Sequence, residues 1–296
     1  MKVAVIGGGS TYTPELIDGL AARHARLPID ELVLHDLDDA RLQVVGGLAG
    51  RMLNRVGWGG HLSLSTDSAA AVDGADFILI QLRVGGQLAR LSDESLPLEF
   101  GTVGQETTGA GGFAKALRTV PIVLELAELV KRRAAPGAWI VDFTNPVGIV
   151  TQALLDAGHR AIGLCNVAIS FQRRFAEQLG VEPERVTLEH VGLNHLSWIT
   201  AVHVDGGDRL PQILDEDAPD IAEMLKLPVA DVRALGAVPS YYLRYYYAFD
   251  EVLAEQRAGH RRAEEVMDLE RQLLEMYADP TLDTKPSLLE HRGGAY

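Results

Sequence analysis

A run of three glycines directly after a short apolar strand is the feature that most limits how this chain can fold. Residues 3–6 are apolar and mostly β-branched, Gly7, Gly8 and Gly9 follow, and a helical pattern begins near Pro14. A strand, a glycine turn and a helix in this order are typical of doubly wound α/β folds. We therefore expect a Rossmann-like unit at the N-terminus.

Strand-like and helical patterns then alternate through the first half of the chain. Apolar runs end near residues 35, 82, 143 and 164, and helical patterns cover residues 40–56 and 114–133. Residues 101–112 hold so many glycines that we predict a loop there. Alternation of this kind predicts right-handed crossovers and a mostly parallel sheet, so the expected fold class is α/β.

The pattern changes in the second half. Residues 186–195 and 197–204 read as two strands close enough in sequence to pair antiparallel, and residues 231–279 read as charged helix. The final segment, HRGGAY, shows no closing helix or strand. We predict a nucleotide-binding domain over residues 1–167 and an incomplete α+β domain over residues 168–296.

Composition excludes several classes of protein. The net charge of −14 argues against nucleic acid as a partner, although a few local arginines could still bind a small anion. No apolar stretch is long enough to cross a bilayer, so we expect no membrane association. A single cysteine cannot form an internal disulfide. We therefore expect a cytoplasmic protein.

The glycine run forms a first candidate site together with Ser10 and Asp36. Such a turn lets the backbone approach a pyrophosphate, and an acidic residue ending the second strand can accept hydrogen bonds from a ribose. Tyr12 stands where the third glycine of the usual motif would be, and Asp36 could instead cap a helix. A carboxylate here would repel a 2′-phosphate, so the pattern favours NAD over NADP.

Cys165 and His195 form a second candidate site, because each follows Gly-Leu or Gly-Leu-Asn at the end of a predicted strand. Thiolate and imidazole suit a divalent cation such as Zn, Mn, Fe or Co. The alternatives are a small buried apolar residue for Cys165 and a hydrogen-bonded histidine for His195. Strand ends converge in a doubly wound sheet, and this convergence favours the metal site.

Three further polar residues and a tyrosine cluster could have either a functional or a structural role. Arg83 and Asn145 end predicted strands, where Asn145 could contact a ligand or simply precede a proline turn, and Arg90 could be a solvated surface charge. A tyrosine near a cation can act as a base, but helical spacing favours packing in the core. The cluster comprises Tyr241, Tyr242, Tyr245, Tyr246 and Tyr247.

Eight strings in the sequence resemble the family 4 glycoside hydrolases, which depend on NAD and a divalent metal. They are collinear and run from residue 3 to residue 296: VAVIGGGS, RVGGQLARLSDE, GQETTGAGG, DFTNP, GLCN, GLNH, YYLRYYY and RGGAY. The resemblance is strongest to the 6-phospho-β-glucosidases. That family continues beyond RGGAY, whereas this sequence stops at Tyr296, so the resemblance implies a chain shortened at its C-terminus.

The resemblance implies an elimination assisted by redox chemistry rather than two-carboxylate hydrolysis. NAD+ would oxidise C3 of the sugar, the C2 proton would become acidic, and the aglycone would leave from C1. Water would add and the hydride would return. A divalent metal, Mn2+ by resemblance, would stabilise the negative charge next to the carbonyl.

The family's site residues carry over by position. Cys165 and His195 match the metal ligands. Tyr242 matches the catalytic base, with Tyr241 as the fallback. Asn166 also belongs to the catalytic set: members acting on α-linked sugars tend to carry an acid at this position, whereas Asn166 cannot donate a proton in that way, so a β-linked substrate is favoured.

The resemblance also gives substrate contacts and partners. Asn145 and Arg90 match contacts to the sugar, and Arg262 matches a contact to the phosphate. The expected substrate is a phosphorylated disaccharide or an aryl 6-phospho-β-glucoside, and a homo-oligomer is expected. The alternatives are a sibling acting on α-linked or non-phosphorylated glycosides, a dehydrogenase of malate or lactate type, and an inactive NAD-binding protein.

Overall fold

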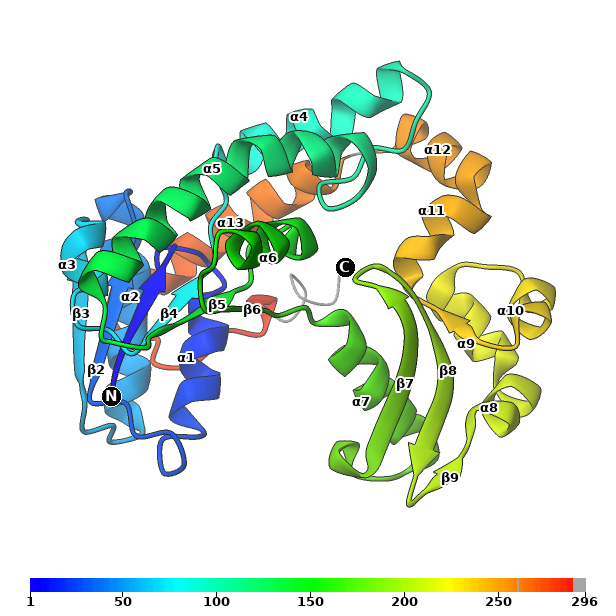
Figure 1. Cartoon of the computed structure of the whole chain (residues 1–296), viewed down its shortest axis with the longest axis horizontal. Coiled ribbons are helices and arrows are strands. Elements are labelled where there is room, and N and C mark those ends of the chain that lie inside the picture. Colours follow the sequence, from blue (N-terminus) through cyan, green and yellow to red (C-terminus); the bar gives the residue numbers. More distant parts are fainter. Residues whose placement is uncertain (260, 290–296) are drawn as a thin grey trace. The chain divides into compact units, whose positions relative to one another are not determined.

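The computed structural model describes residues 1–259 and 261–289, which form two compact units. The first unit contains residues 1–96, 105–164 and the described residues from 261 onward, and the second contains residues 97–104 and 165–259. The C-terminal string HRGGAY lies outside the described residues. Each unit has its own hydrophobic core, so the two are described separately (Figure 1).

A six-stranded parallel sheet is the centre of the first unit. Its strands lie in the order β3-β2-β1-β4-β5-β6, and every neighbouring pair is parallel. This is the strand order of a doubly wound dinucleotide-binding sheet. The predicted fold class is therefore confirmed. The strands are β1 Lys2–Ile6, β2 Glu31–His35, β3 His61–Ser65, β4 Phe77–Ile80, β5 Trp139–Asp142 and β6 Ala161–Gly163.

Helices cover both faces of this sheet, because alternate residues of a strand point to opposite sides. Val3 and Val5 of β1 belong to one apolar cluster with α1, α2 and α13, whereas Ala4 and Ile6 belong to another with α3, α5 and α6. The helices of this unit are α1 Thr13–Ala21, α2 Asp39–Arg55, α3 Ser68–Val72, α4 Gly86–Glu99, α5 Gly109–Arg133, α6 Val147–Asp156 and α13 Arg262–Tyr277. The last residues of α4 group with the second unit.

An antiparallel sheet organises the second unit. β7 Val186–Leu193 pairs antiparallel with β8 Leu196–Val204, as the sequence predicts, and the short strands β9 Gly207–Asp208 and β10 Val238–Pro239 also pair with β8. Figure 1 shows α7 running along β7. The helices are α7 Val167–Leu179, α8 Leu210–Glu216, α9 Ala218–Leu225, α10 Val229–Leu235, α11 Arg244–Tyr247 and α12 Phe249–Ala258, with 3₁₀ turns at Pro183–Arg185 and Tyr241–Leu243.

The glycine-rich segment 101–112 differs from the predicted loop in its last four residues, which form the first turn of α5. The reason is close backbone packing. A Cβ atom on Gly111 would lie 2.2 Å from the carbonyl oxygen of Asp93, and one on Gly112 would lie 2.6 Å from the carbonyl carbon of Thr107. Glycine is therefore needed here for proximity, not for flexibility.

The division into units also differs from the predicted boundary after residue 167. The change of unit falls after residue 164, and α13 groups with the first unit instead of the predicted second domain. The physical reason lies in α13 itself. Leu273 and Tyr277 are fully buried in the core beside α2, and the Tyr277 hydroxyl donates to the carbonyl oxygen of Thr11 at 2.8 Å.

Candidate functional site

The glycine turn is pressed against the end of β2. The backbone N–H groups of Gly7 and Gly8 both donate to the His35 carbonyl, at 2.9 and 2.7 Å, and Gly7 has a φ of +89°. A Cβ atom on Gly8 would lie 2.8 Å from the Cβ of Leu34. A side chain at Gly8 would therefore push the turn off β2, and a Cβ atom on Gly7 would lie 2.6 Å from the Gln81 carbonyl oxygen.

Asp36 lies directly beside this turn. Its Oδ2 accepts the N–H of Gly9 at 3.0 Å, and its Oδ1 accepts the N–H of Asp38 at 3.2 Å. The alternative role of helix cap belongs to Asp38, whose side chain accepts the N–H of Arg41 at the start of α2. Each carboxylate oxygen has a further lone pair, so Asp36 can still accept from ribose hydroxyls.

Side chains fix the turn on its other side. Thr13 Oγ1 donates to the carbonyl of Gly8 at 2.8 Å, and Gln81 Nε2 donates to the carbonyl of Gly7 at 3.0 Å. The Ser10 hydroxyl accepts the N–H of Tyr12 at 3.2 Å, close to the start of α1. A rigid glycine cradle that leads into a helix N-terminus fits the pyrophosphate of a dinucleotide.

In the second unit, Cys165 and His195 face each other. The Cys165 Sγ lies 3.4 Å from the His195 Nε2. Two atoms bound to one tetrahedral cation, at about 2.3 Å for sulfur and about 2.0 Å for nitrogen, lie roughly 3.5 Å apart. The residues therefore fit a shared cation, although a thiol–imidazole hydrogen bond, the alternative for His195, has the same length.

A cation at this point would have two protein ligands, Cys165 and His195. Across residues 1–259 and 261–289, no group of three or more His, Cys, Asp and Glu side chains is placed to hold a metal. A divalent cation with two protein ligands keeps its remaining positions for substrate oxygens or water. Open coordination positions are typical of catalytic metals, whereas structural zinc sites are closed by four protein ligands.

His195 is not the last residue of a strand, as the sequence predicts, but part of the tight turn between β7 and β8. Its φ is +64°, a conformation that histidine adopts more readily than most side chains. The residue is 8% exposed, and burial lowers its pKa to about 4. The imidazole is therefore neutral at pH 7, the form that binds metals.

Tyr242 covers the face of the His195 ring. The two ring centroids are 3.7 Å apart and the planes differ by 9°. Tyr241 instead lies between two rings: it stacks on Tyr242 at 5.1 Å and meets Phe171 at 5.9 Å in a tilted arrangement. Of the two candidates for the base, Tyr242 is the one in contact with the predicted metal ligand. The same packing places both tyrosines in or against the core, so the core interpretation also holds for them.

The two asparagines occupy different surroundings. Asn166 follows Cys165 at the N-cap of α7, is exposed, and makes no side-chain capping bond. Asn145 is half-buried after β5, and its peptide bond to Pro146 is cis. Both positions leave the amide able to meet a ligand. The turn interpretation of Asn145 is equally consistent with this backbone.

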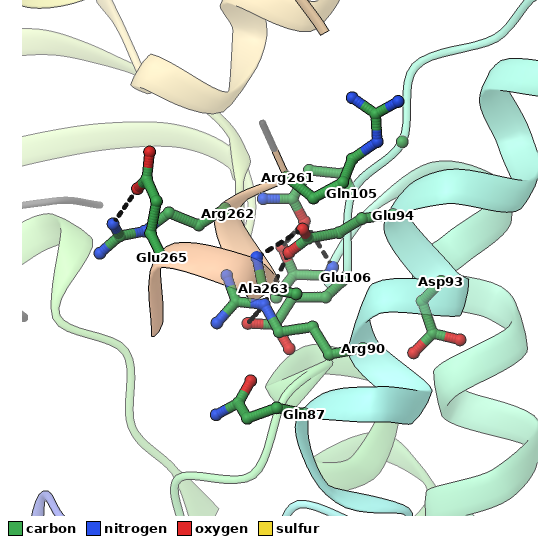
Figure 2. A network of polar contacts seen from close by, with 12 residues as sticks. Gln87, Arg90, Asp93, Glu94, Gln105, Glu106, Arg261, Arg262, Ala263 and Glu265 are labelled. Atoms are coloured by element: carbon green, nitrogen blue, oxygen red, sulfur yellow. Dashed lines mark hydrogen bonds and ion pairs between the residues drawn. The ribbon is translucent and has the colours of Figure 1, made fainter. Parts of the chain in front are cut away.

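Arg90 lies in a buried network of charged groups in the first unit (Figure 2). It is 3% exposed, so the alternative of a solvated surface charge is wrong. Its Nε donates to Glu94 Oε1 at 2.6 Å and lies 3.5 Å from Glu106 Oε1. Glu106 is also paired with Arg83 and with Lys115, whose Nζ is 2.5 Å away.

Glu106 and Lys115 strongly affect each other's ionisation. Burial alone would raise the pKa of Glu106, but Arg83, Lys115 and Arg90 outweigh it and hold the pKa below its usual range. Burial lowers the pKa of Lys115 to about 8, against the opposing effect of Glu106. Sequence reasoning did not single out either residue, because they come from a loop and a helix whose contact is tertiary.

Arg262 begins α13 and is partly exposed. Its Nη1 lies 2.5 Å from Glu265 Oε2, and Figure 2 shows its side chain directed toward Glu265 and away from Arg90. The backbone of this first turn is linked to the network, because the N–H of Ala263 donates to Glu94 Oε2 at 2.8 Å. Glu94 was also missed, although its i,i+4 spacing from Arg90 was a usable signal.

Asp142 is a further buried acid that sequence reasoning missed. It ends β5, is 0% exposed, and accepts the N–H of Thr144 at 3.0 Å. Thr144 in turn accepts the N–H of Leu82 through its hydroxyl, also at 3.0 Å. Burial raises the pKa of Asp142 to about 7, against the effect of the Thr144 hydrogen bond. Asp142 was missed because it is the last residue of an apolar strand, where the sequence pattern indicates only the strand.

The sequence profile "Family 4 glycosyl hydrolase" matches residues 2–181, and "Family 4 glycosyl hydrolase C-terminal domain" matches residues 190–296. The chain therefore belongs to family 4 of the glycosyl hydrolases and is a glycosidase by family. This family membership replaces the alternative of an ordinary dehydrogenase of malate or lactate type.

Its relatives carry specific names. A "Probable 6-phospho-beta-glucosidase" of Bacillus subtilis is 41% identical over 100% of this chain and 70% of its own length. The "6-phospho-beta-glucosidase" of Escherichia coli is 38% identical, over 100% of this chain and 69% of its own. The solved structure of the Thermotoga maritima 6-phospho-β-glucosidase, with manganese, NAD+ and glucose 6-phosphate, has a TM-score of 0.93 at 36% identity, covering 100% of this chain and 70% of that one.

No helix within the described residues is both long and apolar enough to cross a bilayer.

Proposed function

We propose that this protein hydrolyses 6-phospho-β-glucosides to glucose 6-phosphate and an aglycone, with NAD+ and Mn2+ as cofactors. The observation that carries the proposal is the trio in the second unit: Cys165 Sγ 3.4 Å from His195 Nε2, with Tyr242 stacked on the imidazole. Supporting it, relatives that are 41% and 38% identical to this chain are named 6-phospho-β-glucosidases, and the Thermotoga maritima 6-phospho-β-glucosidase was solved with the same two cofactors.

The residues of the chain have distinct tasks in this proposal. Cys165 and His195 hold the cation, and the cradle of Gly7, Gly8 and Gly9 with Ser10 and Asp36 holds the dinucleotide. When bound, NAD+ supplies a reversible hydride acceptor for C3 of the sugar, and the cation supplies positive charge for the oxygens at C2 and C3.

Proton transfer falls to Tyr242. A nearby cation favours the phenolate form of a tyrosine, which can then remove the C2 proton of the oxidised sugar. Loss of this proton expels the aglycone from C1, and water adds in its place. Asn166 lies next to Cys165 and cannot act as a general acid, which favours a β-linked leaving group. Asn145 and Arg90 contact the sugar in this proposal, and Arg262 contacts the phosphate.

Solvent exchange tests the mechanism directly. Turnover of p-nitrophenyl 6-phospho-β-glucoside in D2O, with NAD+ and Mn2+ present, should place deuterium at C2 of the glucose 6-phosphate product. The C2–H is abstracted and replaced in this route, whereas direct displacement at C1 leaves it untouched. A product without deuterium at C2, measured by NMR or mass spectrometry, would overturn the elimination.

A substrate panel tests the specificity. Nitrophenyl glucosides of both anomers, with and without the 6-phosphate, should show turnover of the β-linked phosphorylated compound alone. Turnover of the α-linked phosphorylated compound would instead favour a sibling activity, and NAD binding without any turnover would favour an inactive protein. We further propose a cytoplasmic homo-oligomer, which sedimentation analysis of the purified protein and fractionation of its host cells would test.

A further inference from the structure

Glu94 connects two elements that lie far apart in the sequence. It is on α4, is 5% exposed, and uses both carboxylate oxygens (Figure 2). Oε1 accepts the Nε of Arg90 one turn earlier at 2.6 Å, and Oε2 accepts the backbone N–H of Ala263 at 2.8 Å. Residue 94 and residue 263 are 169 positions apart. This buried side chain therefore ties the first turn of α13 to α4 within the first unit, where Gln87 Nε2 also donates to Glu270 Oε1 at 2.8 Å.

The bond between Glu94 and Ala263 is favoured by the charges of its two partners. Ala263 belongs to the first turn of α13, whose free N–H groups carry a partial positive charge. Its immediate predecessor is Arg262, so the backbone that carries the Arg262 side chain is held by the same carboxylate that holds the Arg90 guanidinium.

We propose that Glu94 is a positioning residue for substrate binding: it fixes Arg90 and the α13 turn bearing Arg262 in one arrangement. This inference rests on the proposed function, which assigns Arg90 to the sugar and Arg262 to its phosphate. Glu94 itself need not touch substrate, because it acts through the two arginines.

The chemistry of the carboxylate explains why another residue would not serve. Both oxygens of a glutamate accept hydrogen bonds, whereas a glutamine has one accepting oxygen and an NH2 group that can only donate. In Glu94→Gln, the amide can satisfy Arg90 or Ala263, but not both. The buried group left without its partner would shift or recruit water, and the arrangement of the two arginines would loosen.

The neighbouring residue offers a matched control. Asp93 lies on the same helix and is equally buried, at 5% exposed, but its carboxylate pairs with Arg118, at 3.2 and 2.6 Å. Asp93→Asn therefore weakens a partly buried carboxylate–arginine pair on the same helix, in which the Arg118 side chain is 30% exposed, while leaving the Arg90 and Ala263 bonds of Glu94 in place.

The experiment measures binding of glucose 6-phosphate by isothermal titration calorimetry, with the full chain saturated with NAD+ and Mn2+. Glu94→Gln should weaken binding of glucose 6-phosphate about tenfold, as expected for loss of one charge-assisted hydrogen bond, while Asp93→Asn stays within about threefold. The affinity for NAD+ should change by less than about twofold in both variants, because neither touches the glycine cradle.

A double-variant cycle separates positioning from general damage. If Glu94 acts partly through Arg262, Glu94→Gln should cost clearly less when it is made in Arg262→Ala than in the wild type. A merely structural role would give equal losses in both backgrounds. If Glu94→Gln fails to fold, Glu94→Asp, whose carboxylate is one methylene shorter, is compared with Asp93→Asn in the same way.

The outcomes distinguish this inference from the function on which it rests. Wild-type protein that binds no glucose 6-phosphate would overturn the proposed function. If the wild-type protein binds glucose 6-phosphate, two results would overturn the positioning role and leave the proposed function standing. One is an equal loss of affinity in Glu94→Gln and Asp93→Asn, and the other is a fully additive loss of affinity in the double variant of Glu94 and Arg262.

Discussion

At the scale of single residues, the His195 ring is held by two side chains, Cys165 and Tyr242. The Cys165 sulfur faces its Nε2, and the Tyr242 ring covers its face. A ring held by stacking loses little further freedom when it binds a cation, so the aromatic contact should raise the affinity for metal. The phenol oxygen and the ring of Tyr242 would then have separate functions, one in proton transfer and one in packing.

Two substitutions separate these functions. Tyr242→Phe keeps the ring and removes the hydroxyl, so Mn2+ affinity should stay within about threefold while the turnover rate falls by about a hundredfold or more. Tyr242→Leu removes the stacking surface as well, and Mn2+ should bind about tenfold more weakly. A titration in which EPR reports free Mn2+ gives the Mn2+ affinity of both variants, and an assay of glycoside hydrolysis gives their turnover rates. Equal Mn2+ affinity in Phe and Leu variants would contradict a role for the ring.

Asp142 should make stability depend on pH. Its pKa is raised from 3.8 to about 7, so the folded protein holds a proton that the unfolded chain has lost. The contribution of this group is therefore full below about pH 4, declines as the pH rises to about 7, and is constant above, a change on the order of 4 kcal/mol at most. Asn cannot ionise, so Asp142→Asn should become more stable relative to wild type over this range.

Urea unfolding at several pH values between 4 and 8 measures that difference. Comparing the variant with wild type at each pH removes the opposite trend from His195, whose lowered pKa makes stability fall as the solution becomes more acidic. A difference between Asp142→Asn and wild type that does not vary with pH would show that Asp142 is ionised in the fold.

At the scale of elements, α13 shows that a sequence pattern can predict a helix without predicting what the helix packs against. Its helical character was predicted, but its place in the fold was not, because apolar spacing identifies a buried face without naming the partner. The partner is α2 and the sheet of the first unit, reached through Leu273 and Tyr277. Strand β3 was also missed: its sequence, HLSLS, alternates, but its residues are only partly buried.

The packing of α13 predicts a stability effect. Leu273 is 0% exposed, so Leu273→Ala should lower the free energy of unfolding by about 2–5 kcal/mol. Met276 lies on the same helix but is 38% exposed, so Met276→Ala should cost less than about 1 kcal/mol. Chemical denaturation compares the two variants. Similar costs at both positions would mean that α13 does not pack on this core.

The glycine elements were predicted with uneven success. The first glycine run was correctly placed between a strand and a helix, because a turn of that kind has a strong local signature. The glycines at 111 and 112 were predicted to form a loop, yet they begin α5. Glycine is required at these two positions because the backbone of Asp93 and Thr107 lies too close for a side chain, and no local sequence pattern indicates that contact.

At the scale of the whole molecule, the two predicted cofactor sites belong to different units. The cradle and Asp36 lie in the first unit, and Cys165 and His195 lie in the second. Each set makes its described hydrogen bonds and ring contacts with residues of its own unit. The two cofactors should therefore bind with largely separable determinants.

Cys165→Ser tests this separation. Mn2+ binding should weaken by about a hundredfold, because one of two protein ligands is replaced by a poor one, while NAD+ affinity should stay within about twofold. Removal of metal by EDTA should likewise abolish turnover and leave NAD+ binding measurable by fluorescence. Loss of NAD+ binding in Cys165→Ser would show that the sites depend on each other.

The sequence by itself determined the α/β class, the glycine cradle with Asp36, and the pairing of Cys165 with His195. These depend on short-range patterns, since strand ends, turns and collinear motifs leave local signatures. Only the tertiary structure decided that Tyr242 covers His195, that Arg90 is buried, and that Glu94 joins it to the start of α13. These contacts join segments distant in the chain, and burial, which decides whether a charge is paired or solvated, exists only after those segments have packed.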